Sequence, residues 1–414
     1  MSHLLVWQAY FFDKQRQADE AILSARQALA LAEQVDARET QAHAQSLLGE
    51  LLPHRGEFEQ AKAYQQQALD YYQKAGDERR QANCLSSLGI IHWRSGNYAQ
   101  ALDYFRQSLP LQQAIRDKAG LAKLMNSIGG VYFEQGDLDQ ALTYVQQSVE
   151  HYQAIGDRLG MAHGWGNLAL VYRGLGKYDL ALAYNQQDLD ASREMGNRHH
   201  IATVFGNRGS VYEELGDLDQ ALSYAQQALQ IQEELGNKWE IARHRAAIGA
   251  IWQKKGDNHQ ALAQYDAALP ILRAHGAGYY VVAPLLGKAE MLYDLREFDA
   301  AREHNQEAFA LAVELGLKDM ILRSHILAAK IDFALSHHDS ARRQLAKLLA
   351  ETQDSAEQAT LHYELWQMGQ DEMHAQAAVA LYRQLYRAKP AFEYKSRLEE
   401  LQAAGQENAW NPSF

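Results

Sequence analysis

Three asparagines, Asn126, Asn167 and Asn207, recur at close to forty-residue spacing, and their chemistry suits peptide recognition. A side-chain amide carries both a hydrogen-bond donor and an acceptor. It can therefore pair with the backbone of a peptide whatever the side chains of that peptide are. The same amides can instead cap a helix or bridge neighbouring repeats of the chain itself. The residue types thus indicate either peptide contact or internal hydrogen bonding, and the sequence leaves both open.

The residues that commonly carry out catalysis do not form a catalytic or metal-binding pattern. The sequence lacks both the phosphate-binding Gly-x-x-x-x-Gly-Lys-Ser/Thr loop and the Gly-x-Ser-x-Gly nucleophile turn. Cys84 stands beside Leu85 and Leu88, which favours a buried, inert thiol. The adjacent histidines of 199–200 and 337–338 would point to different faces of a helix, and no His-x-x-x-His occurs. We predict no enzyme activity, no metal site and no cofactor, and we expect the histidines at solvated turns.

An alanine that recurs every forty residues indicates which elements position these side chains. The alanines are Ala21, Ala61, Ala101, Ala141, Ala181, Ala221, Ala261, Ala301 and Ala341. A glycine keeps the same period five residues earlier, from Gly56 to Gly256. Self-similarity at a period of about 20–50 residues is typical of a solenoid, in which each repeat packs on its neighbours.

Residues 157–196 show how one repeat builds two helices. Gly156 can end the preceding helix in the left-handed conformation, and Asp157 can accept hydrogen bonds from the first N–H groups of the next helix. The same pair recurs at Gly76-Asp77, whereas Arg116-Asp117 keeps only the cap. For the second helices of the repeats, the expected caps are Asp139, Asp179, Asp219 and Asp299.

Two further rows predict how the helices pack. A glycine inside a helix is unfavourable by about 1 kcal/mol relative to alanine, so a recurring one implies a backbone contact that leaves no room for a side chain. These glycines are Gly49, Gly89, Gly129, Gly209 and Gly249. A tyrosine stripe on the second helices favours packing between repeats over recognition, and it comprises Tyr64, Tyr104, Tyr144, Tyr184 and Tyr224.

The pattern within one repeat resembles a known family. The residues that carry it are Trp165-x-x-Leu168-Ala169-x-x-Tyr172, Ala181 and Ala101-x-x-x-Phe105. They resemble the tetratricopeptide repeat (TPR), although the period is forty residues where that family has about 34. This longer variety is similar to the repeats of kinesin light chains, of Pins-type spindle adaptors and of the sensor arms of bacterial regulators. The resemblance implies an all-α fold, a right-handed α-solenoid of about ten helix-turn-helix repeats with a C-terminal capping helix.

The resemblance also implies where a partner binds. Tetratricopeptide superhelices hold extended or helical peptides along a concave face that the first helices line. Carried over to this sequence, the candidate groove residues are Asn83, Trp93, Lys123, Asn126, Phe133, His163, Asn167, Arg173, Asn207 and Arg243. Trp93 and Phe133 either form an anchor pocket or pack under the neighbouring helix.

The repeats divide the chain into three parts. Residues 1–355 hold nine forty-residue repeats, 356–390 an irregular, shorter tenth helix pair, and 391–414 a capping helix and tail. In the capping helix, Leu398 and Leu401 are expected to pack inward while Arg397 faces water. Two interpretations of the N-terminus stay open, namely a first repeat that tolerates exposure or a segment of a longer polypeptide with an effector domain.

Composition narrows the class of partner. The net charge of −12, from 40 basic and 52 acidic residues, argues against nucleic acid. No run of residues approaches the ~18–20 apolar residues of a membrane span. The single cysteine fits a reducing compartment, so we expect a cytoplasmic protein.

Two functions follow from these observations. The first is a non-enzymatic protein–protein interaction scaffold that holds a peptide or a partner helix in its concave groove. The second is the ligand- or peptide-sensing arm of a larger signalling or transcription regulator. The sequence does not identify the partner, the direction of the ligand or the oligomeric state.

Overall fold

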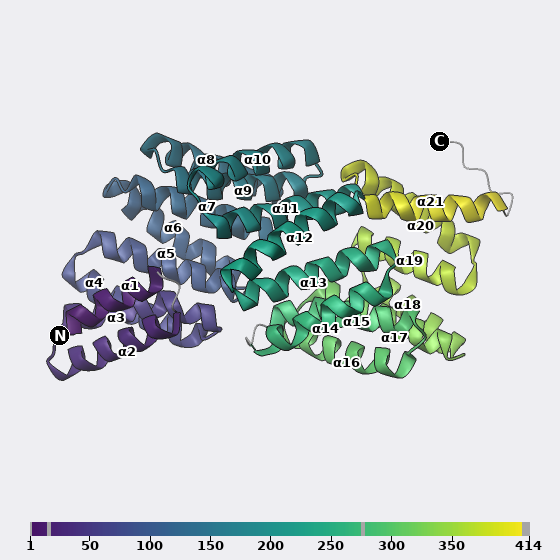
Figure 1. Cartoon of the computed structure of the whole chain (residues 1–414), viewed down its shortest axis with the longest axis horizontal. Coiled ribbons are helices and arrows are strands. Elements are labelled where there is room, and N and C mark those ends of the chain that lie inside the picture. The colour runs from purple at the N-terminus through teal and green to yellow at the C-terminus, as the bar shows by residue number, and fades with distance from the viewer. Residues whose placement is uncertain (1, 15–17, 275–277, 408–414) are drawn as a thin grey trace. The chain divides into compact units, whose positions relative to one another are not determined.

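The computed structural model describes residues 2–14, 18–274 and 278–407, and in these ranges it contains helices and turns but no strand (Figure 1). The chain forms two compact units. Unit 1 comprises residues 1–174 and 186–191, and unit 2 comprises 175–185 and 192–414, so their boundary falls within one helix, α10 (Tyr178–Glu194).

Unit 1 begins with nine α-helices and one short 3₁₀ helix. They are α1 (Ser2–Lys14), α2 (Ala18–Gln34), α3 (Arg38–Leu51), η1 (Leu52–Arg55), α4 (Phe58–Ala75), α5 (Glu78–Arg94), α6 (Tyr98–Ala114), α7 (Lys118–Glu134), α8 (Leu138–Ile155) and α9 (Arg158–Gly174). Each odd-numbered helix packs on the even-numbered helix that follows it, as in α5 with α6 and α7 with α8. Successive odd-numbered helices also touch, α5 with α7 and α7 with α9, so they form a continuous layer. We call this layer the odd-helix layer of unit 1.

Unit 2 repeats the arrangement after α10. Its helices are α11 (Arg198–Leu215), α12 (Leu218–Leu235), α13 (Lys238–Lys255), α14 (Asn258–Ala274), α15 (Gly278–Asp294), α16 (Phe298–Glu314), α17 (Lys318–Ala334), α18 (His338–Glu351), α19 (Ser355–Gly369), α20 (Glu372–Ala388) and α21 (Phe392–Glu407). Here too α13 touches α15, α15 touches α17 and α17 touches α19. The chain is therefore an α-solenoid of helix pairs, as the period predicts.

The turns between repeats confirm the expected glycine and aspartate pairing. Gly76 and Gly156 adopt left-handed φ values of 68° and 71°. The Asp77 carboxylate then accepts a hydrogen bond from the N–H of Arg80 at 3.0 Å. Each helix therefore ends, and the next begins, within about two residues.

The predicted caps of the second helices were displaced by two residues. The N-cap of α8 is Asp137, whose carboxylate accepts from the N–H of Gln140, and Asp139 lies inside the first turn. Asp217 likewise caps α12 in place of Asp219. Asp179 and Asp299 also lie in the first turns of α10 and α16, where a negative charge interacts favourably with the helix dipole and stabilises the helix.

The recurring helix glycines make room for a side chain sixteen residues further along. A Cβ on Gly89 would lie 2.9 Å from Cζ of Phe105, and one on Gly249 would lie 2.7 Å from Cε1 of Tyr265. The helices do approach closely, but the expected backbone contact is nearest only at Gly209, and at the other four glycines a side chain of the partner helix fills the space.

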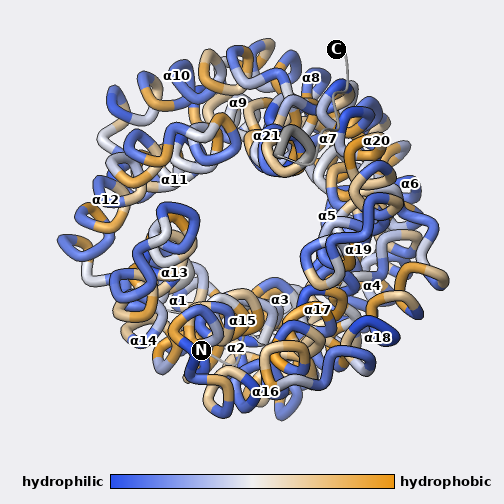
Figure 2. Tube along the Cα trace, turned by 90° about the vertical axis from the view of Figure 1, so that its right-hand side faces the viewer, coloured by the Kyte–Doolittle hydropathy of each residue, from blue (hydrophilic) through white to orange (hydrophobic). Residues whose placement is uncertain are grey.

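The tyrosine stripe packs within a repeat. Tyr104 stacks on His92 with ring centroids 5.2 Å apart, and Tyr144 stacks on Tyr132 at 5.5 Å. Both stacks join the two helices of one pair, and both tyrosines also pack against apolar clusters that include residues of the preceding pair. Figure 2 shows the amphipathic pattern that such pairing requires, since hydrophobic and hydrophilic stretches alternate along the helices.

Candidate functional site

Eight of the ten predicted groove residues lie on three successive odd-numbered helices of unit 1. They are Asn83 and Trp93 on α5, Lys123, Asn126 and Phe133 on α7, and His163, Asn167 and Arg173 on α9. On α7, Lys123, Asn126 and Phe133 are spaced three and seven residues apart, which places them on one helix face. Asn83, Lys123 and His163 are exposed, and the other five are half-buried.

Two of the predicted asparagines of unit 1, Asn126 and Asn167, meet between repeats. The Nδ2 of Asn167 on α9 donates to Oδ1 of Asn126 on α7 at 2.8 Å. This is the bridge between repeats that the sequence left open as an alternative to ligand contact. An amide can form more bonds than this one, since the Asn126 nitrogen is also a donor and the Asn167 oxygen is also an acceptor. The pair can therefore offer one donor and one acceptor to a peptide while it stays intact.

Trp93 and Phe133 pack against glycines of the next odd-numbered helix. A Cβ on Gly130 of α7 would lie 2.6 Å from Cζ2 of Trp93, so the indole occupies the space that any other residue would fill. Phe133 makes only an ordinary contact with Gly174 of α9, with Cε2 at 3.6 Å from such a Cβ, and Leu138 lies closer to it. Both rings remain half-buried. They therefore hold adjacent helices together and still present an apolar edge.

The other two predicted residues, Asn207 and Arg243, belong to unit 2. Asn207 is half-buried on α11. Arg243 on α13 pairs with Glu240 of its own helix at 2.9 Å, and its guanidinium lies 5.2 Å from the ring centroid of Tyr280 on α15. A cation over an aromatic face is attracted by the ring quadrupole. Arg243 thus already contributes to the contact between two odd-numbered helices.

Charged and polar residues that the sequence did not pair connect the odd-numbered helices of unit 2. Lys254 of α13 contacts Glu213 of α11 at 2.8 Å. Gln253 donates to Glu290 of α15, and Glu290 forms an ion pair with Arg323 of α17 at 2.8 Å. Burial lowers the pKa of the Arg323 guanidinium, but the facing Glu290 carboxylate more than offsets it and the net shift is upward. We call these five residues the charged series of unit 2.

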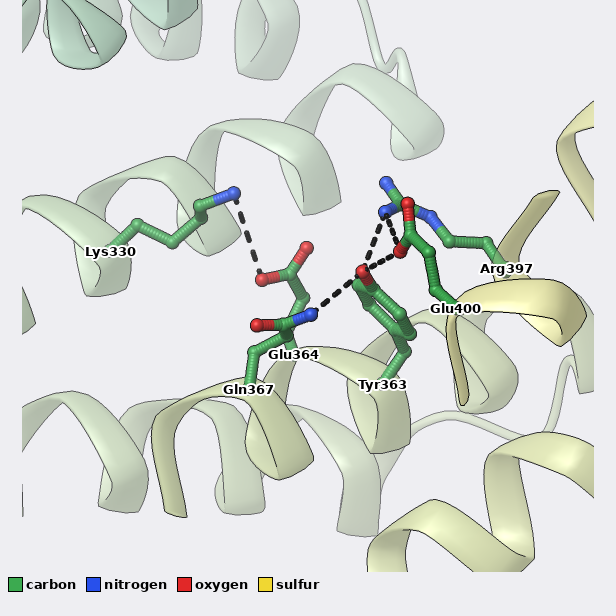
Figure 3. A network of polar contacts seen from close by, with 6 residues as sticks. All are labelled: Lys330, Tyr363, Glu364, Gln367, Arg397 and Glu400. Carbon is green, nitrogen blue, oxygen red and sulfur yellow. Dashed lines mark hydrogen bonds and ion pairs between the residues drawn. The ribbon is translucent and has the colours of Figure 1, made fainter. Parts of the chain in front are cut away.

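A second polar network joins α17, α19 and α21 (Figure 3). The hydroxyl of Tyr363 accepts hydrogen bonds from Gln367 and from Arg397, both at 2.8 Å, and donates to Glu400. Burial and the bond to Glu400 raise the pKa of Tyr363 to about 12. Lys330 approaches Glu364 at 3.7 Å in the same view.

The network corrects one expectation about the capping helix. Leu398 and Leu401 are buried, as the sequence predicts. Arg397 does not simply face water, because its guanidinium lies 4.2 Å from the centroid of the Tyr363 ring.

The comparisons with known proteins agree with this architecture. The family model of the tetratricopeptide repeat matches residues 40–114, 120–194 and 200–274, which together exceed half of the chain. The chain belongs to the tetratricopeptide repeat family. Among curated proteins, no relative matches the sequence.

Several solved structures share the TPR fold of this chain. The apo form of the quorum sensor NprR from B. thuringiensis is 16% identical with a TM-score of 0.56, over 80% of this chain and 96% of that one. A Rap protein complexed with competence and sporulation factor is 14% identical with a TM-score of 0.54, over 83% and 99%. A signal transduction ATPase with a TPR sensor from Pyrococcus horikoshii is 13% identical with a TM-score of 0.53, over 83% and 54%. At these identities the likeness concerns the fold alone.

The TPR helices bury one histidine and partly bury a pair of others, where the sequence led us to expect solvated turns. His92 is 8% exposed beneath Tyr104. His362 and His374 bring their Nδ1 atoms within 2.8 Å of each other between α19 and α20. Within the described ranges, no cluster of three or more His, Cys, Asp or Glu side chains is arranged to hold a metal ion. No described helix is long and apolar enough to cross a membrane.

Proposed function

We propose that this TPR protein is a non-enzymatic interaction scaffold, and that it binds a peptide segment across the odd-helix layer of unit 1. The observation that carries the proposal is the Asn126–Asn167 pair, which presents amide groups of two successive repeats on one face. Exposed Asn83, Lys123 and His163 flank the pair, one on each helix.

The chemistry of this face favours a peptide backbone over a ligand that is recognised by its positive or negative charge. An amide donor and an acceptor pair with any peptide unit, and each neutral hydrogen bond contributes about 0.5–1.5 kcal/mol. The partly exposed edges of Trp93 and Phe133 add apolar contact, which is where binding energy concentrates in many interfaces. Several modest contacts along successive repeats can thus sum to specific binding.

The test uses a peptide selected from a random fifteen-residue display library on the full chain. Its affinity for the variant N126A/N167A should fall roughly 5- to 150-fold, because two hydrogen bonds of about 0.5–1.5 kcal/mol each are lost. The matched control is Q107A/Q147A, which removes two exposed amides forty residues apart on α6 and α8. Fluorescence polarisation measures the affinity, and circular dichroism checks that each variant melts like the parent.

Two results would refute the proposal. One is a set of selected peptides whose affinity for N126A/N167A equals that for the parent chain. The other is an equal loss in the even-helix control, which would place the binding surface elsewhere.

A second candidate function is the peptide-sensing arm of a larger regulator. Two structures with this fold, a quorum sensor and a signal transduction ATPase with a TPR sensor, favour it. A ligand that binds only the folded chain raises its stability by RT ln(1 + [L]/Kd). A thermal-shift screen against short peptides and metabolites separates the two, since a sensor should respond to a small ligand and a scaffold only to a longer peptide.

A further inference from the structure

A short segment between α20 and α21 lies against two turns that are far away in the sequence. The segment is Lys389-Pro390-Ala391-Phe392, and all of its contacts described here are within unit 2. The first turn precedes α10 at Gly176, and the second joins α11 to α12 at Gly216. Helices α11 and α21 also touch directly, and Figure 1 shows the start of α21 beside the end of α11.

Apolar contact covers the two glycine turns. Gly176 and Gly216 have left-handed φ values of 68° and 81°. A Cβ on Gly176 would lie 2.9 Å from Cδ of Pro390, and one on Gly216 would overlap the ring of Phe392. The equivalent turn glycines of the other repeats, by contrast, have nothing within 4 Å of such a Cβ, and they are Gly56, Gly96, Gly136 and Gly256. The segment therefore covers two of a series of otherwise open turns.

A carboxylate beside the second turn fixes the segment electrostatically. The Nζ of Lys389 lies 2.6 Å from Oε2 of Glu214, and the hydroxyl of Tyr178 donates to the same oxygen at 3.2 Å. The side chains of Lys389 and Glu214 are 32% and 26% exposed, so salt screens this pair only in part. Glu214 thus connects α10, α11 and the segment.

We propose that the turns at Gly176 and Gly216, with Tyr178 and Glu214, form a docking site for a Lys-Pro-x-Phe segment that this chain itself supplies. Two turns forty residues apart accommodate Pro390 and Phe392, which are two residues apart, while the ammonium of Lys389 pairs with the carboxylate. We call residues 389–392 the clasp.

The clasp has a structural consequence for unit 2. Each helix from α11 to α21 contacts the next, and with the clasp docked α21 also contacts α11. The clasp therefore fixes the spacing of the odd-numbered helices of unit 2 at both ends of the series. Within one chain the local concentration of the segment is high, and a few contacts suffice to keep it bound. Release of the clasp frees the α20–α21 end and lets the odd-helix layer of unit 2 widen. This inference concerns other residues than the peptide site of unit 1 and stands independently of it.

Pulsed electron paramagnetic resonance tests the clasp. Spin labels at Gln226→Cys on α12 and Ala403→Cys on α21 occupy exposed positions outside the contact. The native Cys84 does not interfere, because burial raises the pKa of its thiol to about 12 and keeps it unreactive. The clasped chain should give one narrow distance distribution.

The variant K389A/F392A should broaden this distribution and shift it to longer distances, with the short-distance population falling by more than half. The matched control K395A/M373A removes an exposed lysine and an exposed large apolar side chain from the same C-terminal helices. The control should keep the parental distribution. A K389A/F392A distribution identical to the parent, or equal broadening in the control, overturns the proposal.

A charge exchange isolates the ionic contact from any folding defect. E214K alone should broaden the distance distribution, because it places two cations together. The double exchange K389E/E214K should recover most of the short-distance population. Failure of the exchange to recover it, in a variant whose circular dichroism matches the parent, contradicts the assigned role of Glu214.

Discussion

Units 1 and 2 each pack their odd-numbered helices side by side, and both use ion pairs, such as Arg80 with Glu39 in unit 1. They differ in the contacts around the predicted groove positions. In unit 1, an aromatic ring rests on a glycine and an amide meets an amide, as Trp93 does on Gly130 and Asn167 does with Asn126. In unit 2, acids meet bases across the same kind of boundary, as at Glu290 and Arg323. The repeat geometry therefore specifies which helices touch, but it does not specify the forces that hold them together.

The contrast is visible at single repeat positions. The position of Trp93 and Phe133 in unit 1 is taken by Glu213 and Gln253 in unit 2, at multiples of forty residues, although Arg173 and Tyr293 depart from this contrast. The position of Gly130 becomes Glu290 four repeats later. Ring burial responds little to salt or pH, whereas partly exposed ion pairs respond to both. The two layers should accordingly fail under different conditions.

The largest expected effect is the loss of one ring from unit 1. Trp93→Ala should lower the free energy of unfolding by about 2–3 kcal/mol, less than the cost of a fully buried tryptophan because the ring is partly exposed. Urea denaturation measures the change, and 1 M salt should leave it unaltered.

Native-state labelling of Cys84 shows whether the loss is confined to unit 1, because this buried thiol on α5 reacts only when the helix opens. The matched change in unit 2 is Gln253→Ala. If Gln253→Ala destabilises the chain as much as Trp93→Ala does, the proposed contrast in packing is wrong.

The next effect is sensitivity of unit 2 to acid. Burial, with a smaller contribution from Arg243 and opposed by Glu240, lowers the pKa of His244 to about 4. Because this folded-state pKa is below the ordinary value of about 6.5, the neutral form stabilises the fold above that pH. About 1–3 kcal/mol should be lost as the pH falls from 6.5 to 4, allowing for the partial exposure of the ring.

His244→Leu should abolish this acid dependence, since Leu124 already occupies the equivalent position in unit 1. Melting temperatures of both proteins between pH 7 and pH 4 measure it. An unchanged slope in the leucine variant would show that another group carries the acid sensitivity. If the opening starts in unit 2, the labelling of Cys84 in unit 1 should begin only after the first melting transition.

These histidine and acid–base contacts mark the limit of prediction from the sequence. The period of forty residues specifies the helix pairs, and the Gly-Asp phrases specify where helices begin, because both depend on local backbone chemistry. His244 and His92 escaped prediction because burial depends on which helix face meets the next repeat. Glu290 and Arg323 are thirty-three residues apart, so the forty-residue period does not pair them. Their contact depends on how each helix is rotated about its axis, which the sequence does not give.

The candidate site was predicted in part, and for a similar reason. The resemblance located Trp93, Asn126 and Asn167 on one layer, since equivalent positions fall on equivalent faces. It did not indicate that the two amides bond to each other, because Asn167 is one residue out of register with Asn126. Contacts between repeats depend on offsets that a strict period conceals.

A smaller effect separates the charged series of unit 2 from the apolar contacts of unit 1. Glu290→Gln should cost about 1 kcal/mol, because the Arg323 guanidinium loses a charged partner while both side chains remain partly exposed. The cost should shrink in 1 M salt, where screening weakens the original pair. Urea titrations at low and high salt measure it, with Trp93→Ala as the salt-insensitive reference. A cost that is equal in both salts would mean that packing, and not charge, joins α15 to α17.

The smallest effect is the coupling between Asn126 and Asn167 themselves. A double-mutant cycle of N126A and N167A without ligand should give a coupling energy of about 0.5–1 kcal/mol, as for one half-buried neutral hydrogen bond. A coupling this small leaves unit 1 folded, so a large loss of peptide affinity in the same double variant would come from ligand contact. A coupling above about 2 kcal/mol would reverse that conclusion, because the amides would then be needed to hold α7 against α9. The size of this one term therefore decides between the two roles that the asparagine spacing allows.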